Sequence, residues 1–184
     1  CGLAEYAQAL LKHLAPAGAA DAELVVLAEE VTAVELAGRD IAAVRRCWKR
    51  GAADLSKLET TIESEQVDLL VLNCHYRFFQ PQVIKLLIQR CQQRGVRVVA
   101  LLHNAFTVDP ALRTLVQEAD CSIVHIPENR LELIANGAQP EKISLIELGV
   151  ERVINPDAAR ARKLLGIPAG QKIVVSFGFV QPHK

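Results

Sequence analysis

Short runs of apolar, often β-branched residues alternate along the chain with longer segments whose apolar positions recur every three or four residues. This alternation is typical of βαβ units arranged around a parallel sheet. Two of the runs, VDLLVLN and VRVVALL, are almost continuously apolar, as expected for strands covered by helices on both faces. The pattern predicts strands at residues 24–28, 44–48, 67–73, 96–102, 122–126, 143–147 and 173–177.

Helices are predicted between these strands from their apolar spacing and from the residues that begin and end helices. Pro81 and Pro127 open two of them, and a glycine follows the end of three. The expected helices are residues 2–14, 53–65 with Asp54 as the N-cap, 81–94, 109–118, 127–136 and 157–165. The expected fold class is therefore α/β, with a Rossmann-like, doubly wound and mostly parallel sheet.

Composition places the chain among ordinary globular proteins. Of its 184 residues 51% are hydrophobic and 23% are charged, which excludes disordered and collagen-like chains. Lys plus Arg equals Asp plus Glu at 21 each, without a basic block, so we expect no nucleic-acid partner. No apolar run reaches the ~20 residues of a membrane-spanning helix, and no signal peptide is visible. The five cysteines form no C-x-x-C pair, which favours reduced thiols in the cytoplasm.

Two features of the sequence suggest a piece of a longer protein. There is no methionine, not even an initiator, and the first residues read as a glycine-containing turn that leads into a helix. In a βαβ unit such a turn follows a strand, so we expect a strand before Cys1. Near the other end, Asn155-Pro156 resembles a linker before a second unit. The expected domains are residues 1–154, lacking a first strand, and residues 155–184, the linker helix and first strand of a second domain.

Polar residues gather just after the predicted strands, where the carboxyl ends of parallel strands meet and α/β folds bind their ligands. The residues in these positions are His75, His103, Asn104, Glu128, Asn129, Gly149 and, after the seventh strand, Gly178, His183 and Lys184. We interpret them as lining a common crevice. For His103 a hydrogen bond to loop backbone is the structural alternative, and for His75 packing of its loop onto the core is. His125 is expected to be structural within a strand, and His13 to lie on a solvated helix face.

Several familiar motifs are absent from the sequence. There is no G-x-G-x-x-G dinucleotide fingerprint, no G-x-x-x-x-G-K-[ST] phosphate loop and no G-x-S-x-G elbow of an α/β-hydrolase. His, Cys, Asp and Glu show no metal-ligand spacing either. We therefore expect neither a metal nor a bound cofactor.

Five segments carry a resemblance to a known family: CGLAEYAQALLKHL, VDLLVLNCHYRFF, VVALLHN, SIVHIPENRLELIANGAQPEKISLIELGV and ARKLLGIPAGQKIVVSFGFVQPHK. Together they resemble the retaining glycosyltransferases of family 4, which are built from two Rossmann-like domains facing across a cleft, the GT-B fold. The fourth segment is similar to the exit from the family's N-terminal domain. The fifth is similar to the entry into the C-terminal domain.

The resemblance implies a parent enzyme that transfers a sugar from a nucleotide-diphosphate sugar to a glycan or lipid-linked saccharide, with retention. The present segment would supply the acceptor-side domain and be inactive alone. The parent would be cytoplasmic, at the inner face of the membrane if it associates peripherally. By this resemblance His103 contacts the donor sugar near the reacting centre, and Gly2, Gly178 and Lys184 bind the donor phosphates. The cleft or acceptor side would be lined by His75, Asn104, Glu128, Asn129 and Gly149.

Two other functions remain open from the sequence. One is a nucleotide-sugar epimerase of the same architecture. The other is a non-catalytic module similar to a glycosyltransferase, which is favoured by two departures from the family pattern. Phe179 stands where the family often has Arg, and Leu148 stands where it has a polar residue. The family's acidic E-x7-E region would lie beyond residue 184.

Overall fold

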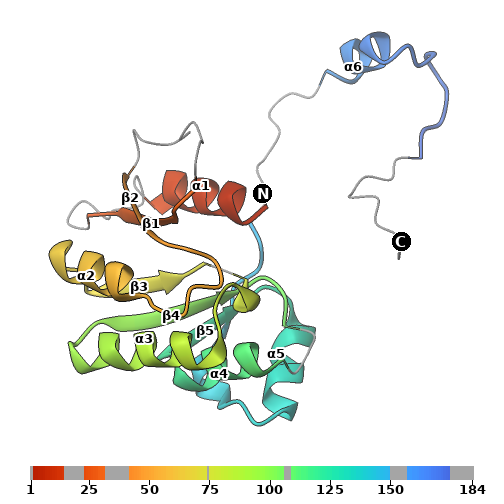
Figure 1. The fold of residues 1–184 in the computed structure, drawn as a ribbon. Helices are drawn as coiled ribbons and strands as arrows, with labels where there is room; N and C mark the ends of the chain where they lie inside the picture. The colour runs from red at the N-terminus through yellow and green to blue at the C-terminus, as the bar shows by residue number, and fades with distance from the viewer. Residues whose placement is uncertain are drawn as a thin grey trace. The chain divides into compact units, whose positions relative to one another are not determined.

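The computed structural model describes residues 2–14, 23–31, 42–73, 75–105, 109–149 and 157–174. The chain divides into two compact units, Cys1–Leu148 and Gly149–Lys184. The first unit alternates strands and helices, and its strands pair in parallel wherever the described residues pair (Figure 1). The predicted α/β fold class with a mostly parallel sheet is therefore confirmed.

Six strands of the first unit form two parallel sheets within the described residues. Four strands pair in the order β3-β4-β5-β6, and the other two form the pair β1-β2. The strands are β1 (Val25–Glu29), β2 (Ala43–Trp48), β3 (Leu69–Leu72), β4 (Arg97–Leu102), β5 (Cys121–Val124) and β6 (Ile143–Leu145). Each of them overlaps a predicted strand.

The helices also follow the predicted segments. They are α1 (Gly2–Leu14), α2 (Ser56–Ser64), α3 (Pro81–Gln93), α4 (Pro110–Glu118) and α5 (Pro127–Ala135) in the first unit, and α6 (Ala158–Leu164) in the second. Helices α3 and α4 pack side by side below the sheet in Figure 1. Short 3₁₀ turns lie at Tyr76–Phe78 and Pro140–Lys142.

Three local expectations need correction. Leu55, not Asp54, is the N-cap of α2, although the Asp54 carboxylate accepts a hydrogen bond of 2.9 Å from the Ser56 backbone N–H. Strand β5 ends at Val124, so His125 follows the strand instead of lying within it. Residues 173 and 174 are not in a strand, and residues 175–177 of the predicted seventh strand lie outside the described residues.

Strand β4 is the centre of the buried core. Val98 and Ala100 of this strand are 0% exposed, as expected for a strand that has neighbours on both edges and helices against it. From α3, Leu87 and Ile88 pack into the same cluster, and Leu115 of α4 joins them. Burial of these apolar side chains fixes the strand that carries His103 at its carboxyl end.

An apolar groove of about 440 Å³ separates the two sheets at the side covered by α1. Strands β1 and β3 both line it, and the apolar stripe of α1 faces it through Leu3, Ala7, Leu10 and Leu11. Val71 of β3 lines the groove and stays 42% exposed. Helix α1 has no buried residue, although its stripe is as apolar as the sequence predicts.

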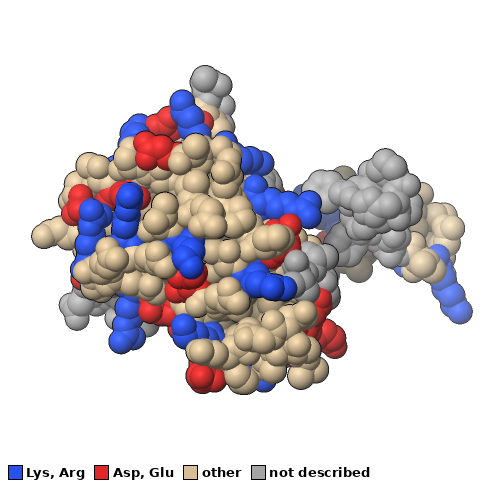
Figure 2. Space-filling view, turned by 60° about the horizontal axis from the view of Figure 1, so that its bottom comes forward, with Lys and Arg blue, Asp and Glu red and all other residues tan. Residues whose placement is uncertain are grey.

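Charged side chains of both signs are interspersed on the face shown in Figure 2. Several pair between helices, such as Arg90 with Glu59 at 2.8 Å and Lys85 with Glu118 at 2.7 Å. Exposed pairs of this kind contribute little to stability. Among the described residues, no helix is both long and apolar enough to span a membrane.

Two adjacent leucines of α3 test the packing of this core. Leu87 is 0% exposed and Leu86 is 49% exposed. We expect Leu87→Ala to lower the free energy of unfolding by about 2–5 kcal/mol, because it leaves a cavity in the core. Leu86→Ala is the matched control and should change it by less than about 1 kcal/mol. Chemical denaturation of both variants measures the difference, and equal values would contradict this account of the core.

Candidate functional site

A cleft of about 460 Å³ opens at the carboxyl edge of the four-stranded sheet. It is lined by residues from the start of α1, from the turn after β3 and from the end of β4. These are Gly2, Leu3, Tyr6, His75, Tyr76, Leu102, His103 and Asn104, together with Leu148. Four predicted site residues, Gly2, His75, His103 and Asn104, thus meet in one cleft. The sheet brings them together because β3 and β4 are adjacent and parallel.

His103 follows β4 and is held through its Nε2 atom. Nε2 lies 2.7 Å from Oδ1 of Asn73, the residue that follows β3. The Asn73 amide nitrogen in turn donates a hydrogen bond of 3.2 Å to the backbone carbonyl of Leu3, in the first turn of α1. One amide therefore joins the helix to the ends of two strands. The partner of His103 is a side chain, not the loop backbone considered as the alternative.

The rings of Tyr6 and His125 form a cluster of three with the ring of His103. The Tyr6 ring meets the His103 ring edge to face, with centroids 4.6 Å apart and an interplanar angle of 80°. The His125 ring lies 5.1 Å from His103 and 5.5 Å from Tyr6. Contacts of this kind restrict the rotation of each ring.

His125 is buried, with 5% of its surface exposed. Its Nδ1 lies 2.8 Å from the carbonyl oxygen of Ile146, which can only accept, so Nδ1 carries the proton. Its Nε2 has no hydrogen-bond partner among the residues that the structure describes. The expectation of a structural histidine was therefore incomplete, because this ring packs directly against the cleft residue His103.

The environment of the cluster disfavours charge. Burial, and secondarily the neighbouring His125, lowers the pKa of His103 below its usual range. Burial raises the pKa of the Tyr6 hydroxyl. No carboxylate is among the described residues that line the cleft. His103 is thus held as a neutral imidazole, a hydrogen-bonding group and not a fixed positive charge.

His75 lines the cleft and also shapes its rim. Its Nδ1 accepts a hydrogen bond of 3.2 Å from the Arg77 backbone N–H, which caps the 3₁₀ turn Tyr76–Phe78. The His75 ring stacks on Tyr76 with centroids 4.4 Å apart. Tyr76 itself is buried, so this loop packs onto the core as the structural alternative states. The two interpretations of His75 are compatible.

Gly2 begins α1 at the cleft. The first turn of a 13-residue helix leaves backbone N–H groups without helical partners, and these groups favour an anion. A Cβ added at Gly2 would meet nothing within 4 Å, so the fold itself does not require a glycine here. A ligand that comes close to this backbone would be a reason for a glycine at this position.

The other predicted site residues are not brought to this cleft by the described structure. Glu128 is exposed in the first turn of α5, and Asn129 is buried with its Oδ1 unpartnered. Gly149 is exposed in the second unit. Gly178 and Lys184 lie outside the described residues.

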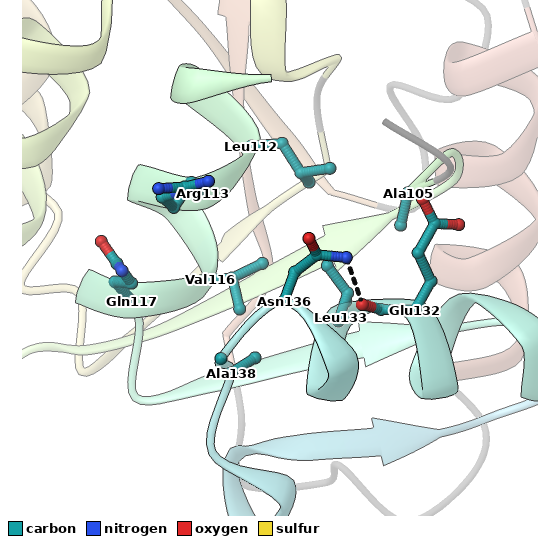
Figure 3. Close-up of a pocket in the computed structure, with 10 residues that line it drawn as sticks. Ala105, Leu112, Arg113, Val116, Gln117, Glu132, Leu133, Asn136 and Ala138 are labelled. Carbon is teal, nitrogen blue, oxygen red and sulfur yellow. Dashed lines mark hydrogen bonds between the residues drawn. The ribbon is translucent and has the colours of Figure 1, made fainter. Parts of the chain in front are cut away.

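Two further features bear on what the site could bind. Figure 3 shows a hollow between α4 and α5, lined by Leu112, Arg113, Val116 and Leu133 among others, and its volume is about 30 Å³. That is room for a water molecule rather than a substrate. Within the described part of the chain, no three His, Cys, Asp or Glu side chains are grouped to hold a metal ion. The cleft around His103 is therefore the better candidate for a small-molecule site.

Three members of this site were missed by sequence reasoning. Tyr6, Asn73 and His125 each contact His103 or position it. A signal existed for Asn73, which is the last residue of the predicted third strand, and for Tyr6, which follows Gly2 by one helical turn. Nothing local in the sequence indicates that the rings of His103 and His125 pack against each other.

Comparison with curated proteins points to a function class. D-inositol 3-phosphate glycosyltransferase of Mycobacterium tuberculosis (strain ATCC 25618 / H37Rv) is 36% identical over 108 residues, covering 47% of this chain and 22% of that protein. The chain is similar to glycosyltransferases. The protein of the same name from Mycobacterium bovis (strain BCG / Pasteur 1173P2) gives the same values. The chain thus matches about a fifth of the length of these relatives. No family model matches it.

The lowered pKa of His103 predicts how stability depends on pH. The folded state favours the neutral ring, so its contribution is present above the unfolded pKa of about 6.5 and is lost as the pH falls through the lower folded value. We expect the free energy of unfolding to fall as the pH is lowered below about 6.5, and His103→Gln to flatten this fall. Denaturation curves across this range measure it, with His13→Gln on α1 as the control. Superimposable pH profiles for wild type and His103→Gln would contradict the prediction.

Proposed function

We propose that the full-length protein is a glycosyltransferase that moves a sugar from a nucleotide-diphosphate sugar to a glycan or lipid-linked saccharide, with retention at the anomeric carbon. The observation that carries the proposal is the cleft at the carboxyl edge of the sheet. There a half-buried neutral histidine and the start of a long helix converge in a chain similar to glycosyltransferases. The segment would form the acceptor-side wall of the active site.

The reaction sets the demands on this wall. The bond between the anomeric carbon and a diphosphate oxygen breaks, and the nucleoside diphosphate leaves with the bonding electrons. The acceptor oxygen forms the new bond and its hydroxyl loses a proton. His103 would hydrogen-bond the donor sugar near this centre. Gly2, with the helix N-terminus behind it, would favour the negative charge of the phosphates or a charged acceptor.

The second unit would supply the cation side of the site. Lys184, supported by the backbone at Gly178, is proposed to neutralise the diphosphate as it leaves, where a preorganised positive charge stabilises the transition state most. His75, Asn104, Glu128, Asn129 and Gly149 remain proposed residues of the acceptor side. Of these, His75 and Asn104 line the described cleft.

Activity of the full-length protein tests the proposal directly. It is incubated with uridine- and guanosine-diphosphate sugars and a panel of saccharide and polyol acceptors, and both nucleoside diphosphate and glycosylated product are measured. Product formation with unchanged anomeric configuration is the expected result. An isomerised nucleotide sugar without net transfer would indicate the epimerase instead. Neither product nor nucleotide-sugar binding would leave a non-catalytic module.

His103 is tested by His103→Ala in the full-length protein. We expect kcat to fall about 10- to 100-fold, because the variant loses the transition-state stabilisation of one to two hydrogen bonds. The exposed His13 on the far end of α1 provides the control variant His13→Ala, which should keep wild-type kinetics. Circular dichroism checks that both variants are folded. Wild-type kinetics for a folded His103→Ala protein would show that the histidine is structural only.

Lys184 is tested by the affinity for the nucleoside diphosphate. Lys184→Ala should weaken binding about 10-fold or more, because it removes a charge-assisted hydrogen bond to phosphate. The exposed Lys172 of the second unit offers a matched control, and Lys172→Ala should leave the affinity unchanged. Isothermal titration calorimetry measures both. Equal affinities for the two variants would remove Lys184 from the phosphate site.

A further inference from the structure

The two hydrogen bonds of the Asn73 side chain fix which end of its amide faces which partner. The backbone carbonyl of Leu3 can accept but not donate, so the Asn73 amide nitrogen must face it, at 3.2 Å. The amide oxygen is then turned toward His103, where it lies 2.7 Å from Nε2. An amide oxygen only accepts, so the proton of this hydrogen bond must belong to the histidine.

The two histidines of the cluster consequently hold opposite tautomers. His125 is protonated on Nδ1, because its partner there is the Ile146 carbonyl. His103 is protonated on Nε2, because its partner there is the Asn73 oxygen. No hydrogen bond joins the Nδ1 atom of His103 to a described residue. That nitrogen keeps its lone pair on a side chain that lines the cleft.

We propose that Asn73 is a positioning residue that locks His103 in the Nε2–H tautomer, so that Nδ1 accepts a hydrogen bond from a hydroxyl group of the bound ligand. The tautomer follows from the contacts alone. The hydroxyl-bearing ligand rests on the proposed function, because sugars and their acceptors are rich in such donors. A fully ionised phosphate offers only acceptors, so it would not form a hydrogen bond with this lone pair.

The groups around the ring support a neutral histidine. The titratable side chains near it are Tyr6 from α1, His125 after β5 and His75 on the rim of the cleft. None of these carries a negative charge at neutral pH. A carboxylate in place of Asn73 would change this, since an adjacent negative charge stabilises the imidazolium form. Asn73 therefore differs from an aspartate by leaving the histidine uncharged.

The experiment follows the ring nitrogens of His103 by ¹⁵N NMR in the full-length protein labelled with ¹⁵N-histidine, and His103→Gln assigns the signals. The wild type should show an Nε2–H neutral ring. Asn73→Leu removes the acceptor and should give a mixture of both tautomers. Asn73→Asp keeps the size and the acceptor toward His103 but loses the donor to the Leu3 carbonyl and adds a negative charge, and it should raise the pKa of His103 by about one unit or more.

Asn136 supplies matched controls, because its amide nitrogen donates to the Glu132 carbonyl of α5 and it does not line the cleft as described. Asn136→Leu and Asn136→Asp should leave the His103 signals unchanged. Unchanged His103 signals in folded Asn73→Leu and Asn73→Asp proteins would overturn the proposal, as would an Nδ1–H ring in the wild type. If Asn73→Leu does not fold, the nearly isosteric Asn73→Asp decides alone.

Kinetics separate this proposal from the proposed function. In an active enzyme Asn73→Asp should move the acidic limb of the kcat/KM pH profile to higher pH, by the same amount as the pKa of His103 measured by NMR. A shift in the NMR titration without one in the pH profile would overturn the role of Nδ1 toward the ligand. Absence of transferase activity in the wild type itself would count against the proposed function, while the ring signals would still decide the tautomer.

Discussion

The candidate site depends on a single amide that has one donating and one accepting end. Asn73 joins the first turn of α1 to His103 at the end of β4, and it does so from the end of β3. Three elements that are distant in the sequence are thereby tied at the carboxyl edge of the sheet. The Leu3 carbonyl fixes the orientation of the amide. The amide oxygen then requires the proton of His103 to be on Nε2, which leaves a lone pair on Nδ1. The orientation of Asn73, and through it the proton position on His103, is thus set by the backbone carbonyl of Leu3, a residue that also lines the cleft.

No carboxylate belongs to the described lining of the cleft, and this affects the charge state of His103. A histidine paired with Asp or Glu is oriented as a base and stabilised once it takes a proton. His103 is instead paired with a neutral amide and packed against Tyr6 and His125. Burial then lowers its pKa, and nothing in the described lining compensates a positive charge. Such a histidine is suited to recognising a hydroxyl group and does not supply a fixed positive charge.

The fold could be predicted from the sequence because its signals are local. The run at 96–102 is nearly all apolar and becomes β4, and Pro81 and Pro127 open helices because proline fits their first turn. The predicted cleft residues that follow β3 and β4 are correctly adjacent for the same reason, since parallel strands end at one edge. Asn73 and His125 were overlooked because their importance lies in tertiary contacts. Whether a polar residue at the end of a strand faces the neighbouring loop or the solvent is not encoded in apolar periodicity.

Helix α1 lines both the cleft and the apolar groove, and Leu3 contributes to each. The helix contributes Gly2, Leu3 and Tyr6 to the cleft, and its apolar stripe lines the groove between β1 and β3. None of its residues is buried, so burial alone anchors it weakly. The Leu3–Asn73 hydrogen bond and the Tyr6 ring contacts tie its first turns to the carboxyl ends of the strands. Burial of this apolar stripe would stabilise the position of α1 against the sheet. Asn73 is hydrogen-bonded to the Leu3 carbonyl of this helix and to His103. A helix held in one position would therefore also restrict the orientation of the His103 ring.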